Sequence, residues 1–195
     1  MIGQNILFKL YFENNQILSK MVSRAENVAK EKHKKQFRKF DNNPYFYHPK
    51  RVAEIISKYK KSKYLPHLIS AAYLHDILED TDLSTKHLKS LFGDLVTSIV
   101  KELTSDQKKI NQFGKQKYLA DKMINMSSWA LVIKLADRLD NISDLNKASN
   151  DFKKKYIKET FYILKELENK RVLTNTQKKI IKEIYNSLYK ILKPL

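Results

Sequence analysis

The sequence contains no cysteine, which excludes disulfide bonds and any metal site built on thiolate ligands. Only three glycines and four prolines occur in 195 residues, so few positions break a helix. No apolar run approaches the roughly 18–20 residues that span a bilayer. The N-terminal apolar stretch, residues 6–12, is interrupted by Lys9 and lacks a small-residue cleavage site. We therefore expect a soluble, cytoplasmic protein with no membrane partner.

The composition indicates one helical domain with a buried core. Hydrophobic residues make up 42% of the chain, which is enough to bury a core rather than leave the chain disordered. A length of 195 residues suits one domain better than two. Because breakers are rare and Leu, Ile and Lys are common, we expect long helices throughout.

The net charge of +17 invites a nucleic-acid interpretation. The lysines are spread along the whole chain, however, and only five of the 38 basic residues are arginine, the residue that phosphate and base recognition favours. The charge therefore does not favour nucleic acid as a partner. It remains fully compatible with a small anionic ligand.

Helical periodicity predicts an all-α, single-domain helical bundle. Apolar residues recur at i, i+3, i+4 and i+7 from Val52 to Tyr59, in a helix that is expected to begin at Pro49. Gly93 is expected to end a helix that follows Ser84. The other expected helices cover residues 66–80, 95–103, 118–124, 129–145, 152–167 and 176–192, the last capped by Thr174 or Asn175. Residues 1–25 are expected to form a helical extension, and residues 26–195 the main domain.

Residues 68–80 read as a helix that is apolar almost all round, yet its last turns carry His75, Asp76, Glu79 and Asp80. Burying carboxylates without partners is costly, so such groups pair, protonate or bind a metal ion. The alternative is a helix end that emerges into solvent. This segment alone leaves the two interpretations about equally supported.

Two further polar residues stand in unexpected places. Asp137 interrupts the apolar run 129–139, and Asn141 lies one turn later on the same face. A simple ion pair with a nearby Lys or Arg would also explain Asp137. His48 directly precedes Pro49, where a histidine is usually a capping or packing residue. Together with His75 and Asp76 they supply a mixed nitrogen and oxygen set that suits a divalent transition-metal ion.

The surrounding motifs resemble the RelA/SpoT-type hydrolase domains of the HD superfamily. That superfamily has a distant His, a His-Asp doublet and a later Asp, which here are His48, His75, Asp76 and Asp137. Four longer matches occur in order between residues 33 and 145: HKKQFRK at 33–39, PYFYHP at 44–49, AAYLHDILEDT at 71–81 and KLADRLDN at 134–141. The pair Glu79-Asp80 separates this branch from many other HD phosphohydrolases.

The resemblance implies a stand-alone alarmone hydrolase with an HD-type fold, which releases pyrophosphate from the 3′ position of ppGpp or pppGpp. It implies one Mn²⁺ ion, held by the four residues of the HD signature. It gives Glu79 and Asp80 the positioning of water and the handling of its proton. Family positions that contact the nucleotide are matched by Arg38, Lys39 and Asn141.

Two departures and several alternatives accompany this interpretation. Lys35 stands where the family usually has Gly, and Ser143 stands where an Arg is common, which puts one substrate contact in doubt. An HD phosphatase acting on NADPH, a dNTP or another nucleotide is the second enzyme hypothesis. A basic helical nucleic-acid-binding protein is the non-enzyme hypothesis. The oligomeric state, including a homo-oligomer, stays open.

Overall fold

The structure is a computed structural model that describes residues 2–192, with side chains described from residue 16 onward. In the described part the regular secondary structure is helical, apart from one isolated bridge between Phe37 and Pro44. Its helices are α1 (Ile2–Lys32), α2 (Tyr47–Tyr59), α3 (Leu65–Tyr73), α4 (Ile77–Asp80), α5 (Thr85–Leu103), α6 (Gln107–Phe113), α7 (Lys115–Asn125), α8 (Ser128–Ser143), the short 3₁₀ helix η1 (Leu145–Lys147), α9 (Asn150–Lys170) and α10 (Asn175–Leu192). The all-α prediction is confirmed.

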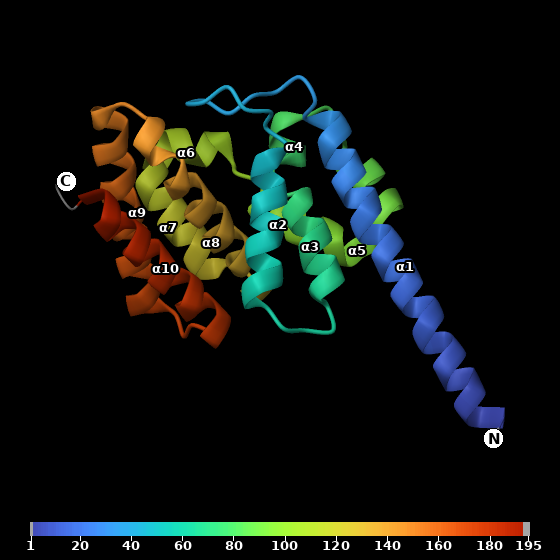
Figure 1. Cartoon of the computed structure of the whole chain (residues 1–195). Coiled ribbons are helices and arrows are strands. Elements are labelled where there is room, and N and C mark those ends of the chain that lie inside the picture. The colour runs from blue at the N-terminus through green and yellow to red at the C-terminus, as the bar shows by residue number, and fades with distance from the viewer. Residues whose placement is uncertain (1, 193–195) are drawn as a thin grey trace.

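The helices form a bundle in which α2 and α8 meet at the centre (Figure 1). Helix α2 also packs against α3, which in turn packs against α1 and α5. On the other side α8 packs against α10, and α7 against α9. The N-terminal part of α1 extends past the bundle (Figure 1). Helix α1 continues without a break through residue 25, where the sequence placed the boundary between the N-terminal extension and the main domain. That boundary stays a prediction.

Apolar residues at helical spacing produce one core. The i, i+3, i+4, i+7 set of α2 faces inward, with Val52 and Ile56 fully buried. Other side chains with no exposed surface come from α3, α8, α9 and α10: Leu68, Leu131, Leu135, Leu164 and Ile184. No helix within residues 2–192 combines the length and the apolarity that crossing a membrane requires.

Most predicted helix limits agree with the structure to within a few residues. Ser84 caps α5 by accepting a hydrogen bond from the backbone N–H of His87. Gly93 interrupts α5 with a φ of 74° and a ψ of −179°, a conformation that is essentially restricted to glycine. Thr174 forms a capping box with Gln177, since each side chain accepts from the other residue's backbone N–H. Helix α6 was not predicted.

The prediction of one helix over 66–80 was wrong. Helix α3 ends at Tyr73, and α4 begins at Ile77. Leu74 and Asp76 have φ values near −100° and ψ values near 0°, so residues 74–76 form a turn. Neighbouring side chains on a continuous helix point about 100° apart. The turn instead lets the side chains of His75 and Asp76 meet.

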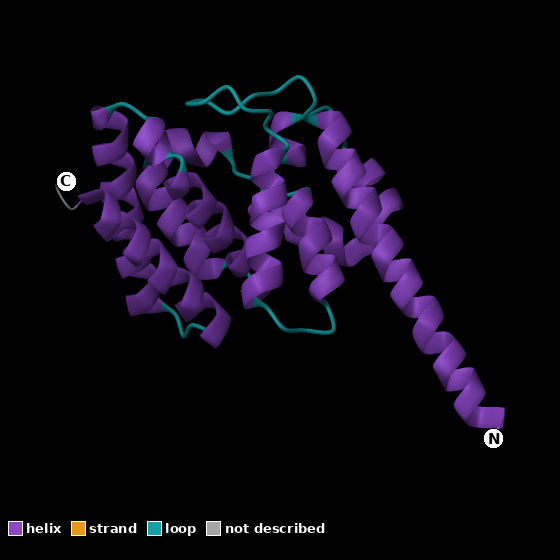
Figure 2. Ribbon diagram, in the orientation of Figure 1, coloured by secondary structure: helices purple, strands orange, loops and turns teal. Residues whose placement is uncertain are grey.

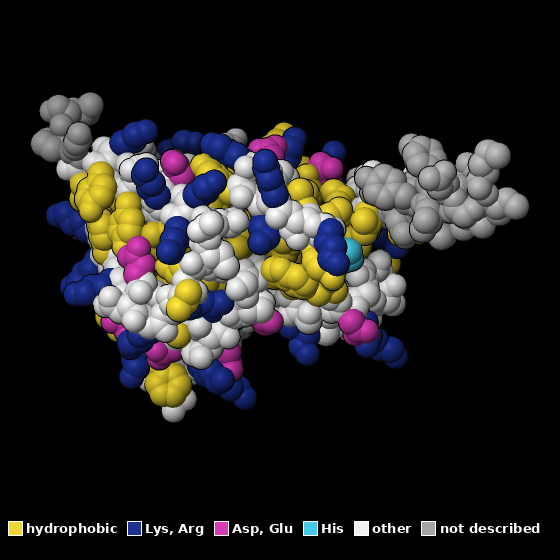
Figure 3. All heavy atoms as spheres, turned by 90° about the horizontal axis from the view of Figure 1, so that it is seen from below, with side chains coloured by type: hydrophobic (Ala, Val, Ile, Leu, Met, Phe, Trp, Pro, Cys, Tyr) yellow, Lys and Arg dark blue, Asp and Glu magenta, His cyan; other side chains and the backbone are white. Residues whose placement is uncertain are grey.

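The ends of several elements meet at one end of the bundle. The loop of residues 33–46 arches over the end at which α2 begins (Figure 2). Helix α4 lies beside the same end (Figure 1). On the face seen in Figure 3, Lys and Arg side chains are scattered among apolar and acidic ones, as the even spread of lysine in the sequence predicts.

Candidate metal centre

Four side chains from three parts of the chain converge at the junction of α2, α3 and α8. His48 lies in the first turn of α2, His75 and Asp76 lie in the turn between α3 and α4, and Asp137 lies on α8. His48 Nε2 is 3.2 Å from His75 Nε2 and 3.2 Å from Asp137 Oδ1. Asp76 Oδ2 is 2.9 Å from His75 Nε2 and 3.7 Å from His48 Nε2. The structure thus brings together all four residues that were predicted as metal ligands.

These separations suit one divalent ion. Adjacent ligands of an octahedral ion bound at about 2.1 Å lie about 3 Å apart. His48, His75 and Asp137 each offer one donor atom, and these three atoms all lie within 4.8 Å of one another. Both imidazoles are buried, at 1% exposure each. Asp76 is less buried, which leaves one side of the cluster accessible to a ligand.

The tautomers of both histidines support the same conclusion. His75 Nδ1 is 2.8 Å from the carbonyl oxygen of Ala72, and His48 Nδ1 is 2.6 Å from Asp140 Oδ2. Because both partners only accept, each Nδ1 carries a proton, and each Nε2 can offer a lone pair to the cluster. Two imidazole nitrogens and two carboxylate oxygens that face one another need a positive charge between them, which a proton or a metal ion can supply. The residues therefore fit a divalent ion.

The charges within the cluster are balanced in pairs. Burial acts to lower the pKa of His75, but the adjacent carboxylate of Asp76 outweighs it and raises that pKa to about 9. Burial opposes ionisation of Asp137, yet Lys134 and His48 hold its pKa well below the usual range. Lys134 Nζ lies 2.8 Å from Asp137 Oδ2. The ion pair considered for Asp137 is therefore present, alongside its contact with His48.

Glu79 and Asp80 lie on α4, one turn beyond Asp76, and both are exposed. Although part of Asp80 reaches solvent, the surrounding protein desolvates its carboxyl group, and this desolvation, with the nearby charges of Asp76 and Glu79, raises its pKa to about 6. Glu79 Oε1 accepts a hydrogen bond of 2.6 Å from the backbone N–H of Ser105. Gln36 donates to the backbone carbonyl of Asp80. Glu79 is thus held through its carboxylate and Asp80 through its backbone, so the solvent-facing interpretation holds for these two acids and the buried one for His75.

Of the three residues predicted to contact substrate, Arg38 and Asn141 lie beside the cluster. Asn141 donates to Asp137 Oδ1 over 2.6 Å and accepts from Arg38 Nη2 over 2.9 Å. Arg38 also pairs with Asp144 at 2.8 Å. Lys39 is exposed, with its ammonium 5.1 Å from the ring centre of Phe152. Their role as substrate contacts stays a prediction.

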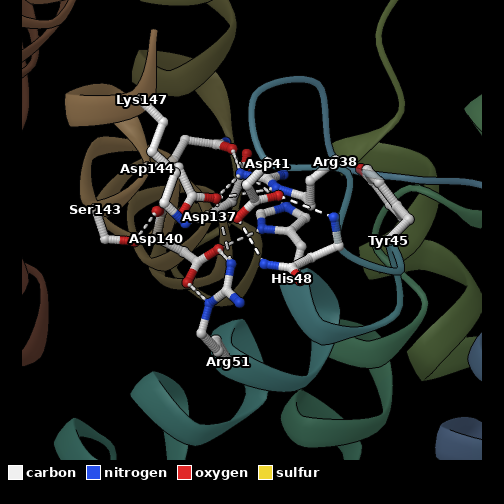
Figure 4. Close-up of polar contacts among 12 residues, drawn as sticks. Arg38, Asp41, Tyr45, His48, Arg51, Asp137, Asp140, Ser143, Asp144 and Lys147 are labelled. Atoms are coloured by element: carbon white, nitrogen blue, oxygen red, sulfur yellow. Dashed lines mark hydrogen bonds and ion pairs between the residues drawn. The ribbon is translucent and has the colours of Figure 1, made fainter.

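Sequence reasoning missed three residues that hold the ligands in place. Tyr45 donates its hydroxyl to Asp76 Oδ2, and Lys134 pairs with Asp137. Asp140 accepts from His48 (Figure 4). The sequence offered one indication of Asp140, which is that it is a second acid in the same apolar helix, three residues after Asp137. Which side chain each of these would meet depends on tertiary packing.

A sequence model described as HD domain matches residues 25–172 of this chain. The chain belongs to the HD-domain family. That span contains the whole cluster, from the loop before α2 to the end of α8, and it extends through α9.

Similar HD proteins include guanosine-3′,5′-bis(diphosphate) 3′-pyrophosphohydrolases from animals and bacteria. The protein named MESH1 from Danio rerio is 37% identical over 124 residues, which are 63% of this chain and 68% of that protein. MESH1 from Xenopus tropicalis is 35% identical and covers 66% of this chain and 72% of its own length. The enzyme from Aquifex aeolicus is 35% identical over 151 residues, but this chain matches only 20% of that longer protein.

Two solved structures share the HD architecture. A metazoan ortholog of SpoT, described as hydrolysing ppGpp, superposes with a TM-score of 0.71 at 27% identity, over 85% of this chain and 94% of that one. The Listeria monocytogenes protein lmo0812 superposes with a TM-score of 0.57 at 17% identity, over 73% of this chain and 99% of that one. The second likeness shows the fold alone.

Proposed function

We propose that this protein is a divalent-metal-dependent hydrolase that removes the 3′-pyrophosphate of ppGpp or pppGpp in the cytoplasm and yields GDP or GTP with pyrophosphate. The observation that carries the proposal is the convergence of His48, His75, Asp76 and Asp137 next to two exposed acids. The reaction itself is taken from the names of the similar proteins, which cover most of this chain.

The four converging residues would hold one Mn²⁺ ion, because two imidazoles and two carboxylates form the mixed set that suits such an ion. The bound ion would supply Lewis acidity, which lowers the pKa of water and polarises a phosphoryl oxygen. Asn141 and Lys134 keep the carboxylate of Asp137 oriented, since each donates to a different oxygen. Tyr45 does the same for Asp76.

Glu79 and Asp80 would handle the proton of the attacking water. A pKa of about 6 leaves Asp80 ionised at neutral pH yet basic enough to accept that proton. The water oxygen bonds to the phosphorus that carries O3′, the bond from phosphorus to O3′ breaks, and the ribose oxygen is protonated as pyrophosphate leaves. Glu79, fixed by Ser105, would orient the water.

Arg38, Lys39 and Asn141 would contact the nucleotide. Arg38 contacts Asn141, which donates to the ligand Asp137, and Asn141 and Asp144 together fix the direction of its guanidinium. The net charge of +17 would favour the approach of a ligand with several negative charges.

The direct test measures pyrophosphate and GDP formed from ppGpp by purified protein with Mn²⁺. Asp76→Ala removes a ligand and should abolish turnover, whereas Asp94→Asn, at an exposed carboxylate paired with Lys89, should not change it. A parallel assay with NADPH in place of ppGpp distinguishes the two candidate substrates. Phosphate release from NADPH without ppGpp turnover would move the proposal to another nucleotide. No turnover of either substrate would contradict the proposed function.

A further inference from the structure

Asp140 lies directly behind one of the proposed ligands, on the side away from the cluster. Its carboxylate is buried, with 3% of the residue exposed, and its Oδ2 accepts from His48 Nδ1 over 2.6 Å. Arg51 donates to both oxygens, from Nε to Oδ1 over 2.6 Å and from Nη2 to Oδ2 over 3.0 Å. Figure 4 shows Asp140 between His48 and Arg51, with a hydrogen bond to each.

This arrangement fixes one tautomer of His48. Both oxygens of Asp140 already accept from Arg51, so the carboxylate can only accept from His48 as well. The proton of a neutral imidazole must then sit on Nδ1. The Nε2 atom, 3.2 Å from both His75 Nε2 and Asp137 Oδ1, is left with its lone pair toward the cluster.

We infer that Asp140 is a positioning residue for the metal centre, and that it holds His48 in its ligating tautomer with Arg51 as its anchor. The inference rests on the proposed function only in assuming that the cluster binds a divalent metal ion. A carboxylate behind a ligating histidine orients the ring and makes the nitrogen at the metal more basic. Its contacts are with His48 and Arg51, so Asp140 would act on the metal site through the His48 ring.

An Asp140→Asn variant would loosen this constraint, because one amide cannot accept from all three donors. An amide oxygen at the position of Oδ1 leaves the N–H₂ group facing His48 Nδ1 and Arg51 Nη2, and an oxygen at the position of Oδ2 leaves it facing Arg51 Nε. Neither orientation carries the negative charge that holds the proton on Nδ1. The share of His48 with its proton on Nε2, directed at the metal position, should therefore rise.

The first experiment compares wild type, Asp140→Asn and the matched control Asp94→Asn. Proton–nitrogen correlation spectra of the histidine rings, recorded without metal, should show His48 protonated at Nδ1 in wild type and in the control, and partly at Nε2 in Asp140→Asn. Calorimetry with Mn²⁺ alone should give a dissociation constant about 10–100-fold higher for Asp140→Asn only. An unchanged tautomer with a change below about threefold would overturn the inference.

A double variant guards against a folding defect. Arg51→Gln with Asp140→Asn removes both charges of this ion pair, of which Asp140 is the buried member, and keeps the net charge. Its Mn²⁺ affinity should also fall, because the carboxylate behind His48 is gone. Wild-type affinity in the folded double variant would overturn the inference. Neither readout uses a nucleotide, so failure to hydrolyse ppGpp would count against the proposed function and not against Asp140.

Discussion

Metal binding to this protein should release a proton, and its strength should therefore depend on pH. In the metal-free protein a proton on His75, shared with Asp76 Oδ2 at 2.9 Å, takes the place of the cation. Burial lowers the pKa of His75 and Asp76 raises it by more, to about 9 from 6.5. Because only deprotonated imidazole ligates, Mn²⁺ must displace this proton at any pH below about 9.

The magnitude follows from one proton exchanged per ion. The dissociation constant of Mn²⁺ should fall about tenfold, or ~1.4 kcal/mol, for each pH unit from about 6.5 to 8.5. The same shift bears on stability. A raised histidine pKa stabilises the fold fully below 6.5, and that contribution is lost as pH rises through 9. The difference of 2.5 units between those values corresponds to about 3 kcal/mol in the metal-free protein.

Calorimetric titration with Mn²⁺ in buffers of different ionisation enthalpy measures both the affinity and the number of protons released. Thermal unfolding of metal-stripped protein should show a midpoint that falls across the same pH range, while the Mn²⁺-saturated protein changes less. A dissociation constant that is flat from about pH 6.5 to 8.5, with no proton released, would refute the reasoning about His75.

Four further predictions concern Asp80, Lys134 and Gly93. Asp80→Asn should lower kcat for ppGpp by about 10²–10⁴-fold in steady-state assays while the Mn²⁺ dissociation constant stays unchanged; equal losses of both would contradict a role in proton transfer. In wild type, kcat should fall as pH drops below about 6, because Asp80 must be ionised to accept a proton. Lys134→Met leaves Asp137 without its buried partner and should destabilise the metal-free protein by about 3–5 kcal/mol in urea unfolding; a loss under about 1 kcal/mol would refute that pairing. Gly93→Ala places a β-carbon at a φ of 74° and a ψ of −179°, and should cost about 1–3 kcal/mol in the same assay, whereas no loss would mean that the kink relaxes.

Features set by neighbouring residues could be predicted from the sequence. The inward face of α2, the cap at Ser84 and the interruption at Gly93 each depend on a few adjacent side chains. The predicted ligands could also be found, because charged and imidazole groups stood inside apolar runs at His75 and Asp137.

Features set by tertiary packing could not be predicted in the same way. Apolar residues continue on both sides of His75 and Asp76, so periodicity extended one helix through a turn that the converging side chains require. The partners of His48 and Arg38, at Asp140 and Asp144, lie 92 and 106 residues away along the chain. Their pairing follows from how α2 and the loop before it lie against α8.

The most direct test of the account is a titration of metal-stripped protein with Mn²⁺ while GDP and pyrophosphate formed from ppGpp are measured. His48, His75 and Asp137 place their donor atoms around one position, with Asp76 next to His75, so turnover should be absent without metal, rise in proportion to added ion and level off at one ion per chain. Full activity in the stripped protein, or saturation of the site with no turnover, would contradict the assignment of these residues to metal-dependent alarmone hydrolysis.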